Sequence, residues 1–218
     1  MARLALATVF LALVAALPAG AAPPNREQVR LNPADQSAAR AAVLRRADLG
    51  PSGRLGGAVK PDLSSGLSCP GYRPRQSDLV LTGPARADFR NTGLQLESVA
   101  QVLKTRSMVA RDWSRTVADP RALPCIRSTL SKSLPSSQQL VSFTSLAFPR
   151  LATYAAAYRG VIVVRSLGRR VSAVVDIVLL GKSRTELTLT AVAPAGARTS
   201  IAAAEVRLGR ALLARVRA

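Results

Sequence analysis

Two carboxylates stand in otherwise apolar surroundings and are the first candidates for chemistry. Asp176 interrupts the run AVVDIVLLG, and Glu205 falls within the apolar arc of a C-terminal helical segment that also contains Ile201 and Leu208. Two carboxyl groups on the buried side of a fold can act as a general acid and base. They can equally form structural ion pairs, because an unpaired buried charge costs too much free energy. The sequence favours structural pairing, and no catalytic residue is assigned.

The turn before Asp176 decides which residues of the preceding strand face it. A two-residue turn at Gly168 and Arg169 places Val161 opposite Asp176, with Arg159 diagonally beside it on the same face. Long side chains reach across such a diagonal. Arg159 is therefore the predicted partner of Asp176.

The turn after Asp176 is predicted to contain three residues, 181–183. That register places Asp176 opposite Thr188 and pairs Leu187 and Leu189 with apolar residues, whereas a two-residue turn would mix polar with apolar positions. A row of charged residues on one sheet face results, and a sheet arginine is expected to pair with Glu205 as well. The predicted structural charge set is Arg159, Asp176, Arg184, Glu186 and Glu205.

Other catalytic and cofactor signatures are missing from the sequence. The chain contains no histidine, which excludes Ser-His-Asp and Cys-His hydrolytic arrangements and histidine-ligated zinc. It has no phosphate-binding glycine loop, no metal-ligand cluster and no GxSxG motif. No metal or cofactor is therefore expected. The candidate lining of an apolar pocket is aromatic and consists of Trp113, Tyr154 and Tyr158, although Trp113 also suits a core position.

The N-terminus is typical of an exported protein. Residues 1–21 have a basic start, an apolar stretch of about 14 residues and a small-residue cleavage site, which predicts a signal peptide. Cys69 and Cys125 are the only cysteines, and in an exported chain they are expected to form one disulfide. We predict a short disordered stretch over 22–30 and a single domain over 31–218, and we place the protein in the extracytoplasmic cell envelope.

The charge of the chain is strongly positive. Lys and Arg number 31 against 12 Asp and Glu, a net charge of +19. Such a protein attracts polyanions, and outside a cell these are anionic lipid headgroups or wall polymers. No nucleic-acid partner is expected, because aromatic residues that could stack on bases make up only 4% of the chain. The alternative is a solvated basic surface with no dedicated partner, and we expect a monomer.

The order of elements predicts an α+β fold. A helix is expected over 32–50, a Gly/Pro-rich loop over 50–74 that wraps the surface or hides a short strand, three strands between 77 and 105, and two helices between 106 and 134. Four further strands and a closing helix over 199–217 follow. The middle strands are apolar on both faces, so the predicted architecture is an antiparallel sheet with helices packed on both faces.

Several segments resemble a known group of actinobacterial proteins. LNPADQSAARAAVLRRADLG, SCPGYRPRQSDLVLTG, WSRTVADPRALPCI, AAYRG and VVDIVLLGKSRTELTLT occur in an order that is similar to the extracellular domain of PknH-type Ser/Thr kinases and to LpqN-type secreted proteins. The resemblance spans most of residues 31–217. It implies a helix-covered antiparallel sheet with a cleft and a non-enzymatic role in binding or sensing envelope ligands. This chain differs from the kinase-linked domains in having no kinase domain and fewer disulfides.

Three functions remain open at this point. The leading hypothesis is a secreted, non-enzymatic binding or sensor-type domain whose apolar sheet face accepts a small hydrophobic or wall-derived ligand. The second is a carboxylate-based envelope hydrolase, which requires Asp176 and Glu205 to converge on an open cleft. The third is a basic adhesin for polyanions or membrane surfaces, and the basic, amphipathic closing helix suits it as well as it suits docking on the sheet.

Overall fold

The computed structural model describes residues 25–52, 55–63, 69–91, 93–166 and 169–217. The predicted signal peptide over 1–21 and the first residues of the predicted disordered stretch lie outside the described residues. No helix within these ranges is long and apolar enough to span a membrane.

Within the described residues, the fold consists of one mainly antiparallel sheet and four α-helices. The helices are α1 (Pro33–Ala42), α2 (Arg106–Thr116), α3 (Ala122–Ser133) and α4 (Arg198–Ala214), with 3-10 segments η2 (Arg46–Ser52) and η3 (Ala195–Ala197). The strands are β1 (Gln28–Val29), β2 (Leu55–Val59), β3 (Val80–Asn91), β4 (Leu94–Leu103), β5 (Gln138–Ser145), β6 (Tyr154–Ser166), β7 (Arg169–Lys182) and β8 (Thr185–Pro194).

The strands form one sheet in the order β1-β3-β4-β8-β7-β6-β5, and β2 pairs with β3 off this path. All pairings are antiparallel except the short parallel contact of β1 with β3. The strands β5 to β8 form the predicted meander, and the β3–β4 hairpin joins it at β8. The prediction of a single α+β domain is confirmed.

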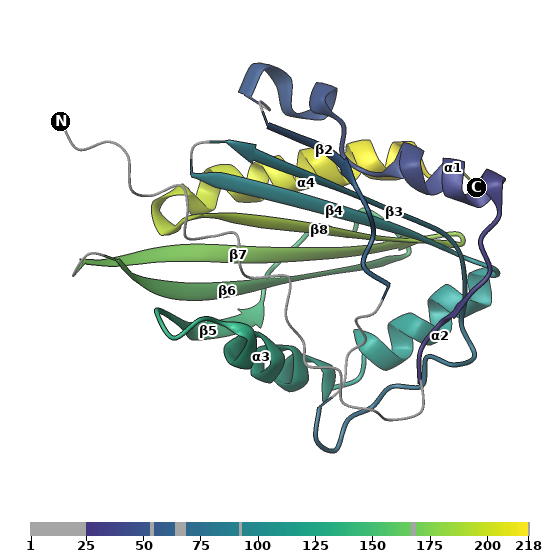
Figure 1. The fold of residues 1–218 in the computed structure, drawn as a ribbon, viewed down its shortest axis with the longest axis horizontal. Coiled ribbons are helices and arrows are strands. Elements are labelled where there is room, and N and C mark those ends of the chain that lie inside the picture. The colour runs from purple at the N-terminus through teal and green to yellow at the C-terminus, as the bar shows by residue number, and fades with distance from the viewer. Residues whose placement is uncertain (1–24, 53–54, 64–68, 92, 167–168, 218) are drawn as a thin grey trace.

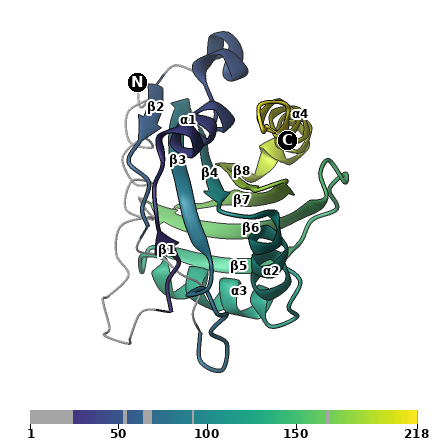
Figure 2. The same cartoon turned by 90° about the vertical axis from the view of Figure 1, so that its right-hand side faces the viewer.

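Helices cover both faces of the sheet, as Figure 2 shows with α1 and α4 on one side and α2 and α3 on the other. The main core lies between the sheet and the α1–α4 layer, where buried Leu208 and Leu212 of α4 pack with Val174, Val178 and Leu189. We call this side the α1–α4 face and the opposite side the α2–α3 face. Successive strand residues alternate between the two faces.

Helix α1 begins where the sequence predicts and ends earlier. Asn32 caps it by accepting a hydrogen bond from the Asp35 amide at 2.8 Å. The predicted end at Gly50 is wrong, because the helix stops at Ala42. The chain then turns so that Val43 and Leu44 become buried, and the Leu44 amide donates to the Ser98 hydroxyl of β4 at 2.8 Å. Burial of two apolar side chains therefore outweighs continuation of the helix.

Two strands, β3 and β4, occupy the region between 77 and 105 where the sequence predicts three. The Gly83-Pro84 pair lies inside β3, next to a register shift between Leu81 and Gly83. Pro84 is tolerated because β1 and β2 pair with β3 on either side of it and leave its outer edge without a strand partner. Within the predicted 50–74 loop, the structure contains the short strand β2, one of the two expected alternatives.

The two cysteines form the predicted disulfide. Cys69 and Cys125 are bonded across a sequence separation of 56 residues. The bond ties the segment before β3 to α3, where Cys69, Tyr72 and Ala122 pack into a small cluster with Cys125. Tyr72 fastens the same segment to α2 by donating its hydroxyl to the Arg115 carbonyl.

Candidate functional site

Asp176 is paired with Arg159, although by a different register from the predicted one. Arg159 stands directly opposite Asp176 on the neighbouring strand, and Val161 pairs with Val174 instead. The Arg159 guanidinium donates to both carboxylate oxygens, with a distance of 2.6 Å from Nε to Oδ1. Asp176 is completely buried on the α1–α4 face. The ion pair therefore forms between two neighbouring strands of the sheet, and the Asp176 carboxylate is not exposed to solvent.

Glu205 of α4 lies above this ion pair, and three ionisable side chains meet there, of which Arg159 stays 18% exposed. The Glu205 side chain is only 1% exposed, no described N–H group donates to its carboxyl oxygens, and it lies within hydrogen-bonding reach of Asp176. Burial first, and then the charge of Asp176, raises the pKa of Glu205 to about 8, whereas Arg159 lowers it. At neutral pH Glu205 therefore holds a proton beside the Arg159–Asp176 ion pair.

The geometry of this acid pair bears on the hydrolase hypothesis. Asp176 and Glu205 come together, as an acid and base pair requires, but the sheet and α4 enclose them. Neither residue lines the cavity between α3 and β5 or the one between α1 and the β7–β8 turn. A substrate in solution has no path to these carboxylates in this structure, so the open cleft that the hypothesis needs is not at this pair.

The rest of the predicted charge row is wrong, because the turn after β7 is shorter than predicted. Lys182 pairs with Thr185, which leaves a two-residue turn with Ser183 in the left-handed region at φ 55°. Asp176 consequently faces Ala191 rather than Thr188. Arg184 lies in the turn itself, and Glu186 projects from the opposite face of the sheet.

Arg184 instead pairs with Asp35 of α1, 149 residues away in the sequence, through distances of 2.7 and 3.1 Å. Hydrogen bonding from Arg184 holds the pKa of Asp35 at about 2. This pair borders a cavity of about 240 Å³ between α1, the β7–β8 turn and the end of α4. The ion pair satisfies the charges of Asp35 and Arg184, whereas Arg217, which also lines this cavity, takes part in no ion pair within the described residues.

Glu186 belongs to a group of three acids beneath α2. Burial, and then the charge of Asp112, raises the pKa of Glu186 well above its ordinary value, and its Oε1 atom is buried without a hydrogen-bond partner. Burial also raises the pKa of Glu27 to about 7 and that of Asp112, which accepts a hydrogen bond from Gln76 at 2.8 Å. No set of three potential ligands in the described ranges has the geometry of a metal site. Burial and the nearby charges of the other acids therefore make these carboxyl groups hold their protons to a higher pH than exposed ones do.

The three predicted pocket residues lie on the α2–α3 face but do not form one pocket. Trp113 of α2 packs against Tyr154 with ring centroids 5.3 Å apart and ring planes tilted by 33°, at the β6 end nearest α2. Tyr158 is buried and stacks on Phe143 of β5 at 5.8 Å. Of these four aromatic residues, only Phe143 lines the cavity between α3 and β5. Tyr158 packs against Phe143 without lining that cavity, and Trp113 and Tyr154 do not line it either.

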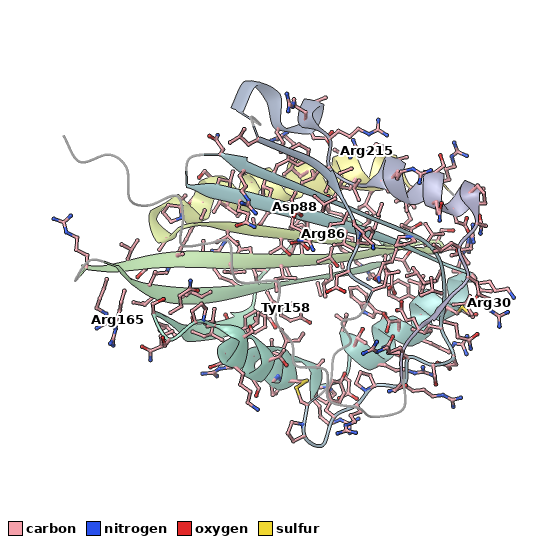
Figure 3. The ribbon with its side chains drawn as sticks, in the orientation of Figure 1. Arg30, Arg86, Asp88, Tyr158, Arg165 and Arg215 are labelled. Atoms are coloured by element: carbon pink, nitrogen blue, oxygen red, sulfur yellow. A yellow bond between two sulfur atoms is a disulfide. The ribbon has the colours of Figure 1, made fainter. Side chains whose placement is uncertain are left out.

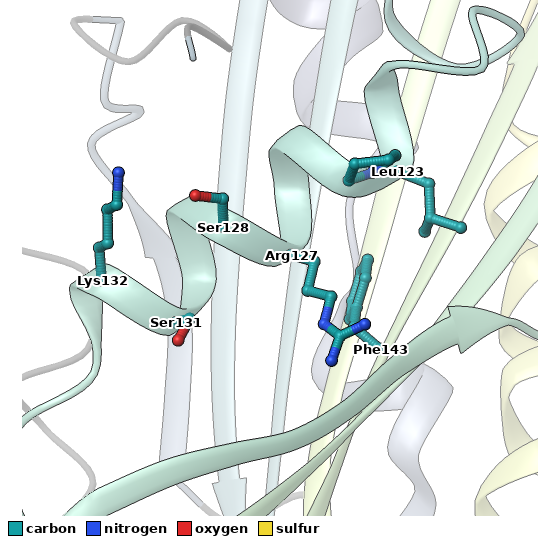
Figure 4. A pocket seen from close by; sticks show the side chains of 7 residues that line it. Leu123, Arg127, Ser128, Ser131, Lys132 and Phe143 are labelled. Atoms are coloured by element: carbon teal, nitrogen blue, oxygen red, sulfur yellow. The ribbon is translucent and has the colours of Figure 1, made fainter. Parts of the chain in front are cut away.

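A cavity of about 430 Å³ lies between α3 and β5 (Figure 4). This volume is within the range of small-molecule sites in proteins. The cavity has an apolar part and a basic, hydroxyl-bearing part, and its lining consists of Leu123, Pro124, Arg127, Ser128, Ser131, Lys132 and Phe143. Figure 4 shows Arg127 extending from α3 toward the Phe143 ring, with Lys132 farther along the helix.

Both cations of this pocket are available to a ligand. Arg127 and Lys132 are exposed and take part in no ion pair within the described residues. No acid occurs anywhere in residues 120–175, a segment that contains all of α3, β5 and β6. The pocket was not anticipated from the helix and strand patterns. This acid-free segment is the sequence signal that could have located it.

Comparisons with known proteins give structural matches only. No protein-family model matches the sequence, and no curated protein matches it. The crystal structure of the Rv0999 ortholog of Mycobacterium smegmatis, an uncharacterised protein, overlaps with a TM-score of 0.44 at 14% identity, covering 84% of this chain and 98% of that chain. LpqN of Mycobacterium tuberculosis, described as involved in cell envelope biogenesis, overlaps with a TM-score of 0.32 at 12% identity, covering 73% of this chain and 83% of that chain. Both overlaps are remote, and the resemblance to PknH-type domains stays a prediction.

Proposed function

We propose that this protein is a non-enzymatic, extracytoplasmic binding domain for a small amphiphile that has an anionic head and an apolar body. The observation that carries the proposal is the α3–β5 pocket, which joins an apolar wall to two unpaired cations. Its ligand class refines the small hydrophobic or wall-derived molecule that the sequence suggested. The proposed site is formed by α3 and β5 rather than by Trp113 and Tyr154.

The chemistry of the lining supports an amphiphile over a purely apolar ligand. Leu123, Pro124 and Phe143 offer an apolar surface whose burial favours binding by about 25 cal/mol for each Å² removed from water. Arg127 and Lys132 offer charge-assisted hydrogen bonds, which are about twice as strong as neutral ones. A carboxylate or phosphate head attached to a hydrocarbon body would satisfy both parts of the pocket.

Two further observations support the extracytoplasmic setting. The disulfide between Cys69 and Cys125 is of a kind that persists in oxidising compartments outside the cytoplasm. The apolar segment over 1–21 has the pattern of a signal peptide. Both agree with a protein that meets its ligand in the cell envelope.

Isothermal titration with dodecanoate and with the neutral alcohol of the same chain length tests the proposal. We expect Arg127→Gln and Lys132→Gln each to weaken dodecanoate binding by about tenfold, because each removes a charge-assisted hydrogen bond. Binding of dodecanol should change by less than about twofold. Arg150→Gln is the matched control, since Arg150 is exposed, lies in the same acid-free segment and does not line the pocket.

The outcomes separate the alternatives. Equal losses in the Arg127 and Arg150 variants would show that only net charge attracts the anion, and the pocket assignment would fail. Absence of heat for both ligands, together with no copurifying adduct in native mass spectrometry of the protein exported by its own host, would remove the binding function itself.

A further inference from the structure

The ends of β6 and β7 farthest from α2 project beyond the rest of the described sheet, as Figure 1 shows at its left side. Strand β8 ends opposite Ala173, so residues 169–172 of β7 have no strand partner on that side among the described residues. Strand β5 begins opposite Val164, and the last contact on that side is the Arg165 amide donating to the Ser137 carbonyl at 2.8 Å. We call residues 163–166 and 169–172 the arm. It is a two-stranded extension that the rest of the described sheet contacts at its base, where Val163 and Val164 pair with β5.

The arm concentrates unpaired positive charge. Arg165, Arg169 and Arg170 are all exposed, and none has an ion-pair partner in the described part of the chain. Figure 3 shows Arg165 near the outermost point of the sheet. Arg165 and Arg170 stand directly opposite each other, an arrangement that destabilises a strand pair. The arm therefore holds a charge arrangement that costs stability and that a negatively charged surface would relieve.

An exposed apolar side chain accompanies these cations. Val171 is 40% exposed and lies on the same sheet face as Arg169, whereas Arg165 and Arg170 project from the opposite face. An arm that carries arginine on both faces and an exposed apolar residue on one suits the interface of an anionic bilayer, where headgroups bind the guanidinium groups and the apolar group enters the boundary with the acyl chains. A soluble anionic polymer offers no such boundary. The combination favours a lipid surface over a wall polymer.

We propose that the arm docks the protein on an anionic lipid bilayer. This surface is separate from the α3–β5 pocket, and the proposal goes beyond ligand binding. The basic end of the pocket and the arm are connected by a short segment of chain. Lys132 lies near the end of α3, and residues 134–137 lead from there to β5, where the Ser137 carbonyl accepts a hydrogen bond from the Arg165 amide of the arm. Docking through the arm would bring the basic end of the pocket toward the surface from which an anionic amphiphile could be taken.

Vesicle flotation tests the proposal with the purified protein and vesicles of phosphatidylcholine, alone or with about 30% phosphatidylglycerol. Each basic residue near an anionic surface strengthens binding by about fivefold, so the triple variant Arg165→Gln/Arg169→Gln/Arg170→Gln should bind the anionic vesicles about 100-fold more weakly. The matched control is Arg40→Gln/Arg106→Gln/Arg210→Gln. It removes the same charge from exposed positions on α1, α2 and α4.

Equal losses in the two triple variants would overturn the proposal, because net charge alone would then explain binding. Val171→Ser, compared with Val59→Ser at a residue of nearly equal exposure, 39%, separates the two kinds of anionic partner. We expect Val171→Ser to weaken binding to vesicles several-fold and to leave retention on dextran sulfate unchanged. An unchanged vesicle affinity would contradict membrane docking. Dodecanoate titration of the arm variant should match wild type, so the pocket and the arm can fail independently.

Discussion

Glu205 is predicted to make the protein less stable as the pH rises. In the folded chain its pKa is about 8, against an ordinary value of 4.5. Below about pH 4.5 both the folded and the unfolded chain carry the proton, so the group has no effect on stability. Between the two pKa values only the unfolded chain releases the proton, which favours unfolding. Above about pH 8 the loss of stability is complete.

The size of the effect follows from the same two values. Each pH unit between them is worth about 1.4 kcal/mol, which sets a ceiling of about 5 kcal/mol. Water entering around an ionised Glu205 would reduce this, so we expect about 2–5 kcal/mol. Glu205→Gln keeps the size of the side chain and cannot ionise. Its free energy of unfolding should lie within about 1 kcal/mol of wild type near pH 5 and exceed wild type by about 2–5 kcal/mol near pH 9.

Urea unfolding of the oxidised protein, followed by the fluorescence of the only tryptophan, Trp113, measures this difference. Other acids with raised pKa values, including Glu27 and Glu186, titrate in both proteins, so only the difference between the two curves reports Glu205. Glu205→Ala serves as a second variant, because a cavity should lower its stability at every pH. A constant separation between wild type and Glu205→Gln from about pH 5 to 9 would refute the buried acid pair.

Three other predictions concern stability. Replacing Cys69 and Cys125 by serine should lower the free energy of unfolding by about 4 kcal/mol, since the closed loop spans 56 residues; a loss below about 1 kcal/mol would contradict this in urea unfolding. Asp35→Asn should cost about 1–3 kcal/mol near neutral pH. Because the folded pKa of Asp35 is about 2, that difference should vanish as the pH falls from about 4 to 2, and a pH-independent difference would argue against the ion pair. Gly83→Ala should lower the thermal midpoint strongly, because its new methyl carbon would lie 2.2 Å from the Asp35 carbonyl oxygen, whereas Gly57→Ala meets no atom within 4 Å and should be nearly neutral.

The order of elements could be predicted from the sequence, but the register around Asp176 could not. The predicted turn at 181–183 rested on pairing apolar residues across β7 and β8. Strand β7 is apolar on both faces, with Val174 and Val178 on one and Val175 and Ile177 on the other, so alternation contains little information about register. Ser183, which is not a glycine, adopts the left-handed conformation in the observed turn.

The contacts at the candidate sites could also be predicted only in part from the sequence. The contact between Arg159 and Asp176 was accessible because the two residues lie on consecutive strands. The ion pair of Asp35 with Arg184, and the acid group that joins Glu27 to Asp112, connect elements far apart in the sequence. No local pattern encodes such contacts, and only the packing of helices on the sheet creates them. The α3–β5 pocket is of this kind as well.

An NMR titration tests the central claim most directly. Amide and aromatic resonances of the labelled protein would be followed while dodecanoate is added. The account predicts that the largest shifts occur along Leu123 to Lys132 of α3 and at Phe143, with little change at Trp113 and Tyr154. Shifts centred on Trp113 and Tyr154, or no shifts at saturating ligand, would contradict a binding site between α3 and β5.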